Sequence, residues 1–242
     1  MQPRRLAMGG DRGTPHTCPI RCRAARHAEH AERKASLNNE QSEAQKNMLA
    51  LSVVAHPSPT SFSHAMAEAA AFSLQELGYV VQCHDLYAEG FNPVQPVGET
   101  QNTRSDEELV ERHCLELQTA DLILVFHPNW WSQPPAILKG WIDRVFRLNT
   151  AYAYPEGTGL DGVPVRLLRA KAALVFNTSN TALAREQEVF GDPLDRLWKT
   201  SVLDLCGVRN VMRRLYGPMA TSSATERQAW LAEVRSLVQS VA

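Results

Sequence analysis

The sequence predicts an α/β fold in which helices cover both faces of a parallel sheet. From Met48 onward, short apolar runs typical of buried strands alternate with longer segments of helical periodicity. Strands and helices that alternate in this way usually build a parallel sheet with helices on its faces. The chain has 242 residues, and that length is enough to bury a full hydrophobic core.

Five segments are predicted to be strands. The runs MLALSVVA and LILVF are apolar throughout, which is typical of strands buried on both faces of a sheet. The last of the five segments has the weakest pattern. The predicted strands cover residues 48–55, 79–86, 122–126, 172–176 and 210–215.

Five further segments are predicted to be helices. The first has apolar and small residues along one side and ends before Gly78, and the third begins after Pro134 and Pro135. The predicted helices cover residues 61–77, 106–118, 136–146, 193–206 and 225–241.

The formal net charge of −1 hides two unlike segments. Residues 1–47 contain nine basic and five acidic residues, a net charge of +4, whereas the remaining residues contain 16 basic and 21 acidic ones, a net charge of −5. The first segment also lacks an apolar face. We therefore expect residues 1–47 to be a disordered basic extension and residues 48–242 to be the folded domain. An alternative is that Met48 is the natural start of the protein.

Composition and spacing exclude several classes of protein. The folded part has no basic excess of the kind that nucleic-acid binders show, and no apolar run approaches the roughly 18 residues of a membrane span. An odd number of cysteines, five, argues against a disulfide scaffold and favours the cytoplasm. No metal site is expected, because the spacing of the cysteines and histidines in the first segment does not suit zinc; these residues are Cys18, Cys22, His27 and His30. Cys83, Cys114 and Cys206 fall in predicted core elements.

Three loops are candidates for a ligand site. In an open parallel sheet, ligands bind beyond the carboxyl ends of the strands. The loops that follow the first, third and fourth predicted strands read HPSPTSFS, HPNWWSQPP and NTSNT, and they cover residues 56–63, 127–135 and 177–181.

Each loop has a functional and a structural interpretation. Four hydroxyl groups before a helix suit a phosphate group, although Thr60 or Ser61 as a helix cap would explain part of the pattern. Trp130 and Trp131 suit stacking on a planar cofactor, but two indoles could also cover the sheet edge or contact a second subunit. The small polar residues of NTSNT can line the pyrimidine edge of a flavin.

The segments AHPSPTSFSHAM, LGYVVQCHDLYAEGFNPV and WWSQPPAILKGWIDRVF resemble the NAD(P)H:quinone oxidoreductase family. The similarity covers most of residues 48–242. It implies a flavodoxin-like three-layer sandwich, with a five-stranded parallel sheet of order 2-1-3-4-5. It also implies a homodimer that binds flavin, with FAD slightly favoured over FMN, and uses NAD(P)H as co-substrate.

The resemblance also implies roles for individual residues. It places His56, Ser61, Phe62 and Ser63 around the flavin phosphates and ribityl chain. It places Pro128, Asn129, Trp130 and Trp131 against the isoalloxazine ring, and Thr178, Ser179, Asn180 and Thr181 along its pyrimidine side. Tyr152 and Tyr154 match tyrosines that close over the substrate in the dimer.

The chain departs from the family at two positions. Phe190 stands where the mammalian-type enzymes have a histidine that steadies the charge of the reduced flavin, and Ala184 lies near the position of their tyrosine. Neither role carries over, and no catalytic residue is assigned. Arg185 and Glu186 are nearby polar residues without an assigned role.

The sequence favours a flavin-dependent NAD(P)H oxidoreductase. Hydride would pass from NAD(P)H through the flavin to a quinone or similar acceptor, with ping-pong kinetics because both substrates share one pocket. Two alternatives are a regulatory flavoprotein subunit of a potassium efflux system and a flavodoxin-like electron carrier. The charge of −5 is mild for a carrier.

Overall fold

The computed structural model describes residues 48–101, 104–157 and 163–242. The expected disordered segment and the four cysteines and histidines rejected as zinc ligands lie outside the described residues. In the part of the chain that the structure describes, no helix has the length and apolar character needed to cross a membrane.

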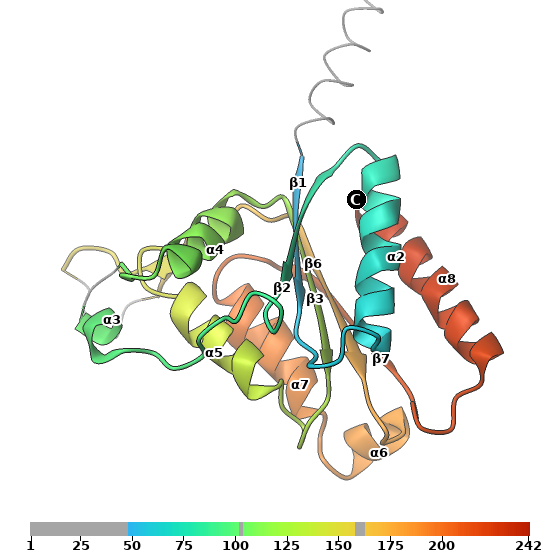
Figure 1. Ribbon diagram of the computed structural model, residues 1–242. Helices are drawn as coiled ribbons and strands as arrows, with labels where there is room; N and C mark the ends of the chain where they lie inside the picture. The colour runs from blue at the N-terminus through green and yellow to red at the C-terminus, as the bar shows by residue number, and fades with distance from the viewer. Residues whose placement is uncertain (1–47, 102–103, 158–162) are drawn as a thin grey trace, which may run out of the picture. The chain divides into compact units, whose positions relative to one another are not determined.

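A five-stranded sheet forms the centre of the domain (Figure 1). The strands lie in the order β2-β1-β3-β6-β7, and every neighbouring pair is parallel. Strands β4 and β5 form a separate two-stranded sheet. When they are left out of the numbering, the order of the main sheet is the expected 2-1-3-4-5. The sheet strands are β1 (Leu49–Val54), β2 (Val80–Asp85), β3 (Leu122–Pro128), β6 (Ala172–Thr178) and β7 (Asn210–Tyr216).

Helices cover both faces of the sheet and complete the three-layer sandwich. Helices α2 (Phe62–Glu76) and α8 (Ala224–Val241) lie on one face, on the right in Figure 1. Helices α4 (Glu108–Thr119), α5 (Ala136–Val145) and α7 (Pro193–Arg196) lie on the other. Successive residues of β1 enter opposite cores, because side chains alternate across a strand: Leu51 and Val53 face α5, whereas Ala50 and Val54 face α2.

Local signals set the ends of the main helices. Ser61 caps α2 by accepting a hydrogen bond from the amide of His64, and Gly78 follows the helix with a φ of 86°. Ser223 and Glu226 form a reciprocal capping box at the start of α8. These helices therefore lie within one or two residues of their predicted ranges.

The sequence prediction missed the short elements. These are α3 (Val97–Gln101), the antiparallel pair β4 (Tyr152–Ala153) and β5 (Val165–Arg166), and α6 (Leu183–Glu188). Segments of two to six residues carry too little periodicity to be recognised. The helix predicted over 193–206 is α7 followed by a π-helical segment, η2 (Leu197–Asp204). The placement of Cys83 in the core was wrong, since it is exposed on the edge strand β2, whereas Cys114 and Cys206 are buried.

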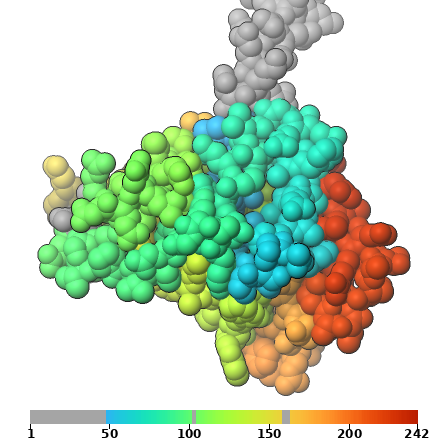
Figure 2. Space-filling view, viewed as in Figure 1, coloured from blue at the N-terminus to red at the C-terminus, as the bar shows by residue number. Residues whose placement is uncertain are grey.

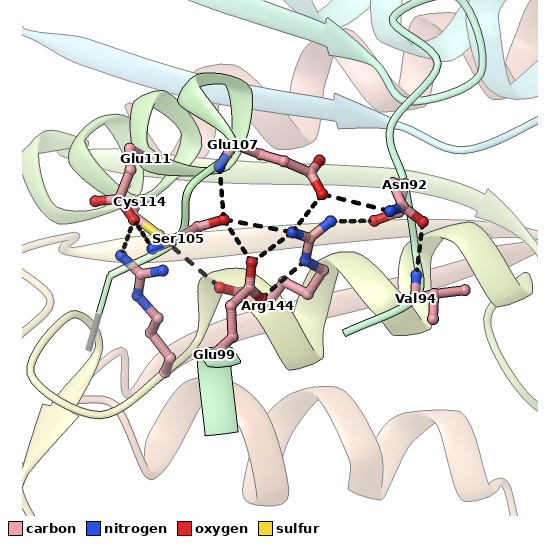
Figure 3. A network of polar contacts seen from close by, with 9 residues as sticks. Asn92, Val94, Glu99, Ser105, Glu107, Glu111, Cys114 and Arg144 are labelled. Atoms are coloured by element: carbon pink, nitrogen blue, oxygen red, sulfur yellow. Dashed lines mark hydrogen bonds and ion pairs between the residues drawn. The ribbon is translucent and has the colours of Figure 1, made fainter. Parts of the chain in front are cut away.

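Arg144 fastens the long connection between β2 and α4 to helix α5 (Figure 3). Its side chain is fully buried, and its Nε donates to Glu99 Oε2 at 2.9 Å and its Nη1 to the Asn92 carbonyl at 2.6 Å. Its Nη2 donates to Glu99, at 2.5 Å, and to Glu107, at 2.9 Å. Burial opposes the ionisation of Glu99, but hydrogen bonds from Arg144 and Ser105 outweigh it and lower the pKa of this carboxyl. A buried ion pair thus holds α3 in place.

We expect Arg144→Met to lower the free energy of unfolding by about 3–5 kcal/mol, because the Glu99 carboxylate would stay buried without its partner. Lys139→Met is the matched control on the same helix. Its partner is Asp143 and both side chains are about half exposed, so about 0–1 kcal/mol should be lost. Urea unfolding followed by circular dichroism measures both, and equal losses would contradict the prediction.

Candidate functional site

Three loops converge on one cavity of about 440 Å³ at the carboxyl edge of the sheet. In Figure 2, the blue segment after β1 reaches the surface beside the yellow-green, orange and red parts of the chain. Eleven of the twelve residues expected at a flavin line this cavity: His56, Ser61, Phe62, Pro128, Asn129, Trp130, Trp131, Thr178, Ser179, Asn180 and Thr181. The twelfth, Ser63, is buried behind it in the first turn of α2.

Four other residues complete the lining: Thr60, Glu186, Met219 and Arg227. Met219 and Arg227 were missed by the sequence analysis, because they come from the turn after β7 and from α8, far along the chain from the three loops. The one sequence feature that could have indicated these two residues is that they follow the last strand, beyond its carboxyl end, where ligands bind in such sheets. The Arg227 side chain donates hydrogen bonds from Nη2 to the Met219 carbonyl at 2.9 Å and from Nε to the Ser222 hydroxyl at 2.8 Å.

The first loop ends at the N-terminus of α2. The amide of Ser58 donates to His56 Nδ1 at 3.0 Å, and burial lowers the pKa of His56. His56 is therefore neutral above pH 7. Helix N-termini leave amide groups without intrahelical partners and carry a partial positive charge. The cavity therefore has a polar end that can accept an anion.

The second loop displays two indoles. Trp130 and Gln133 exchange two backbone hydrogen bonds of 3.0 Å, so residues 130–133 form a tight turn. Its two central residues, Trp131 and Ser132, both have a φ of 57°, which is strained for side chains of this size. The turn leaves Trp131 98% exposed and Trp130 42% exposed. The indoles thus offer a flat apolar wall instead of packing into the core.

Glu186 ties the second and third loops together. It is 3% exposed, and its Oε1 accepts from Asn129 Nδ2 at 2.8 Å and from the Ser179 hydroxyl at 3.4 Å. Its Oε2 accepts from the Ser132 hydroxyl at 3.4 Å. Asn129 Oδ1 is buried and has no hydrogen-bond partner among the described residues. A carboxylate thus orients the Asn129 amide and leaves its oxygen as a buried acceptor without a partner among the described residues.

His127 fixes the end of β3 beneath the cavity. It is fully buried, and burial lowers its pKa to about 4. The neutral ring donates from Nδ1 to the Pro128 carbonyl at 2.8 Å. Its Nε2 accepts from Asn177 Nδ2 at 2.7 Å and from the Trp198 indole at 3.0 Å. The strand that carries the tryptophan loop is therefore held by uncharged hydrogen bonds.

Several residues singled out in the sequence lie away from the cavity. Tyr152 and Tyr154 lie in and beside β4, with ring centroids 6.0 Å apart, and neither lines the cavity of its own chain. Phe190 and Ala184 do not line it either. Arg185 packs over the Phe190 ring at 5.7 Å.

A second cluster of ionisable residues lies between β2 and α4. His84, Glu89 and His113 are close enough to share a metal ion. However, the Trp141 indole, which can only donate, bonds His113 Nδ1 at 2.9 Å. His113 Nε2 must then carry the proton, and it points to Glu89 Oε2 at 3.2 Å. This tautomer leaves His113 Nε2 without a lone pair for a metal ion, although neither Nε2 nor Glu89 Oε2 has a hydrogen-bond partner among the described residues.

Comparison with known proteins agrees with this architecture. Residues 48–238 match the family model of the flavodoxin-like fold. A Haemophilus influenzae protein named as an uncharacterized NAD(P)H oxidoreductase is 33% identical over 186 residues, which cover 75% of this chain and 89% of that protein. Rat NAD(P)H dehydrogenase [quinone] 1 is 32% identical over 179 residues, which cover 65% of this chain and 64% of that enzyme.

Among solved structures, the NAD(P)H:quinone oxidoreductase of Methanothermobacter marburgensis superposes with a TM-score of 0.66 at 26% identity. The match covers 79% of this chain and 96% of that one. Fold, strand order and sequence all agree, and the chain therefore belongs to the flavodoxin-like family of oxidoreductases that includes the NAD(P)H:quinone reductases.

Proposed function

We propose that this protein is a flavin-dependent NAD(P)H oxidoreductase that reduces a quinone or a similar acceptor. The observation that carries the proposal is the convergence of the three strand-end loops on one cavity, with an anion-binding end, an indole wall and a polar edge. The names of the relatives support the same class of activity. Free thiols at Cys83, Cys114 and Cys206 support the cytoplasm as its compartment.

The residues of the cavity fit a flavin. Its volume lies within the usual range for small-molecule sites. Thr60, Ser61 and Phe62 would hold the phosphate end beside the first turn of α2, with His56 next to them. Pro128, Trp130 and Trp131 would hold the ring, and Thr178, Ser179, Asn180 and Thr181 would line its pyrimidine edge. When bound, a flavin supplies two-electron redox chemistry. FAD remains slightly favoured over FMN.

The chain itself contributes binding and orientation. The unpartnered Asn129 Oδ1 can accept a hydrogen bond from a ring N–H of the ligand, because the Asn129 amide nitrogen is already committed to Glu186. With a flavin ring against them, the indoles would exclude water from one side of that ring. NAD(P)H and the acceptor would use the same exposed face in turn, which gives ping-pong kinetics.

A homodimer would complete the site. Tyr152 and Tyr154 do not line the cavity of their own chain, and the family resemblance assigns them to the substrate pocket of the dimer. We therefore propose that the partner subunit supplies these two side chains.

The purified protein should be yellow, and initial rates at varied quinone and several fixed NADPH concentrations should give parallel double-reciprocal lines. Parallel lines are expected because one product leaves before the second substrate binds. Intersecting lines would contradict the shared pocket. A colourless protein that takes up no flavin would rule out the proposed function.

We expect Glu186→Ala to raise the Kd for flavin about 10- to 100-fold, since hydrogen bonds to a charged group contribute about 1.5–3 kcal/mol and the Asn129 amide would lose its anchor. Flavin fluorescence quenching measures the Kd. Glu188→Ala, exposed on the same short helix, is the control. If both variants bind flavin as the wild type does, Glu186 does not position Asn129.

Light scattering should give the mass of two chains for the flavin-bound protein, because a dimer is needed to bring the tyrosines to the cavity. Tyr154→Ala should raise KM for the quinone and leave the flavin content unchanged. A monomer with full quinone reductase activity would contradict the proposed dimer.

A further inference from the structure

A chain of three side chains runs from the cavity to the edge strand of the sheet. Ser61 lines the cavity, and its hydroxyl lies 2.8 Å from His64 Nδ1. His64 Nε2 lies 2.9 Å from Asp85 Oδ2. Ser61 caps α2, His64 lies in its first turn and Asp85 ends β2. The His64 side chain is 14% exposed and that of Asp85 28%, so the contacts are partly shielded from water.

The carboxylate of Asp85, the last of these three side chains, determines the tautomer of His64. Asp85 Oδ1 accepts from the amides of Tyr87 at 3.1 Å and Ala88 at 3.2 Å, which fixes the orientation of the carboxylate. An ionised carboxylate can only accept hydrogen bonds. His64 Nε2 must therefore carry a proton that it donates to Asp85, and only Nδ1 is free to gain or lose a proton.

The two protonation states of His64 reverse the hydrogen bond to Ser61. When His64 is neutral, its Nδ1 accepts the Ser61 hydroxyl proton, and Ser61 presents only lone pairs to the cavity. When His64 is protonated, Nδ1–H donates to the Ser61 oxygen, and the hydroxyl proton is free to point into the cavity. The second state suits a phosphate oxygen, because it adds both a donor and a nearby positive charge.

We propose that Ser61, His64 and Asp85 form a proton-linked anchor, in which binding of the flavin phosphate at Ser61 is coupled to protonation of His64. This inference rests on the proposed function, since it requires a phosphorylated flavin in this cavity. His64 and Asp85 are positioning residues that act through the Ser61 hydroxyl. By linkage, phosphate binding takes up a proton, so the affinity must fall as the pH rises.

Two titratable groups, Asp85 and His56, interact with His64. Asp85 faces His64 from β2, and His56 interacts with it from the loop after β1. Burial lowers the pKa of His56, so His56 is neutral above pH 7. His56 therefore adds no charge change of its own to a titration between pH 7.0 and 8.5. Arg227 lines the same cavity, and a guanidinium group does not lose its proton in proteins.

A different role for the same three residue types is nucleophilic catalysis by serine. Here, however, the Ser61 oxygen also accepts from the His64 amide at 3.4 Å as the cap of α2. In addition, the Ser61 amide donates to the Ser58 carbonyl at 3.1 Å. Both contacts fix the serine as part of the helix terminus, where anions bind.

The test compares FMN with riboflavin, which has the same ring but no phosphate. Each is titrated by fluorescence quenching into the full-length protein, freed of any flavin, between about pH 7.0 and 8.5. A phosphate monoester is a dianion in this range. The Kd for FMN should rise by up to about tenfold per pH unit, the limit for uptake of one proton. The Kd for riboflavin should stay constant.

Two variants locate the proton. His64→Gln can donate to Ser61 without a charge change, so it should remove the pH dependence of FMN binding and leave riboflavin binding intact, which also shows that the cavity is folded. Asp85→Asn should reduce the slope, because the imidazolium loses its counter-charge. Ser58→Ala is the control in the same loop, since Ser58 contacts Thr60 at 3.1 Å and should keep the wild-type slope.

Equal pH dependence for FMN and riboflavin, or a wild-type slope in His64→Gln, would overturn this inference while leaving the proposed function in place. If neither flavin binds at any pH, the proposed function is wrong as well. The two failures are therefore distinguishable in one set of titrations.

Discussion

The parallel arrangement of the five strands is the constraint on which the site depends. Parallel strands all end at the same edge of the sheet, so the segments that follow β1, β3 and β6 must leave the core side by side. Residues separated by more than a hundred positions in the chain, such as Ser61 and Thr178, thereby share one cavity. The helices on both faces bury the apolar strands and keep this edge free for loops.

Buried polar groups then fix the loops at that edge. Glu186 holds Asn129 in one orientation, and neutral His127 joins the end of β3 to the Asn177 amide and to the Trp198 indole. A buried polar group is costly unless its hydrogen bonds are satisfied, so these partners limit the loops to one arrangement. Arg144 acts in a similar way, because its buried ion pair with Glu99 holds the connection between β2 and α4 against α5.

The candidate site combines hydrogen-bonded strand ends with side chains that are exposed on a turn. Its floor is made of strand ends and hydrogen-bonded amides, while Trp131 is almost fully exposed on a strained turn. The end of the cavity beside the first turn of α2 connects through Ser61 and His64 to Asp85 on the edge strand. This division suits a protein whose chemistry would come from a bound cofactor, because the chain then needs to bind, orient and adjust charge.

The sequence alone determined the strands, the main helices and the three loops, because hydrophobic periodicity and capping residues act over a few neighbouring positions. The family resemblance, and not the local pattern, implied the twelve flavin residues, of which eleven line the cavity. Tertiary structure decided the rest. Glu186 meets Asn129 across 57 positions, His64 meets Asp85 across 21, and Arg227 arrives from the last helix. Such contacts depend on how the strands stack in the sheet, which no local pattern encodes.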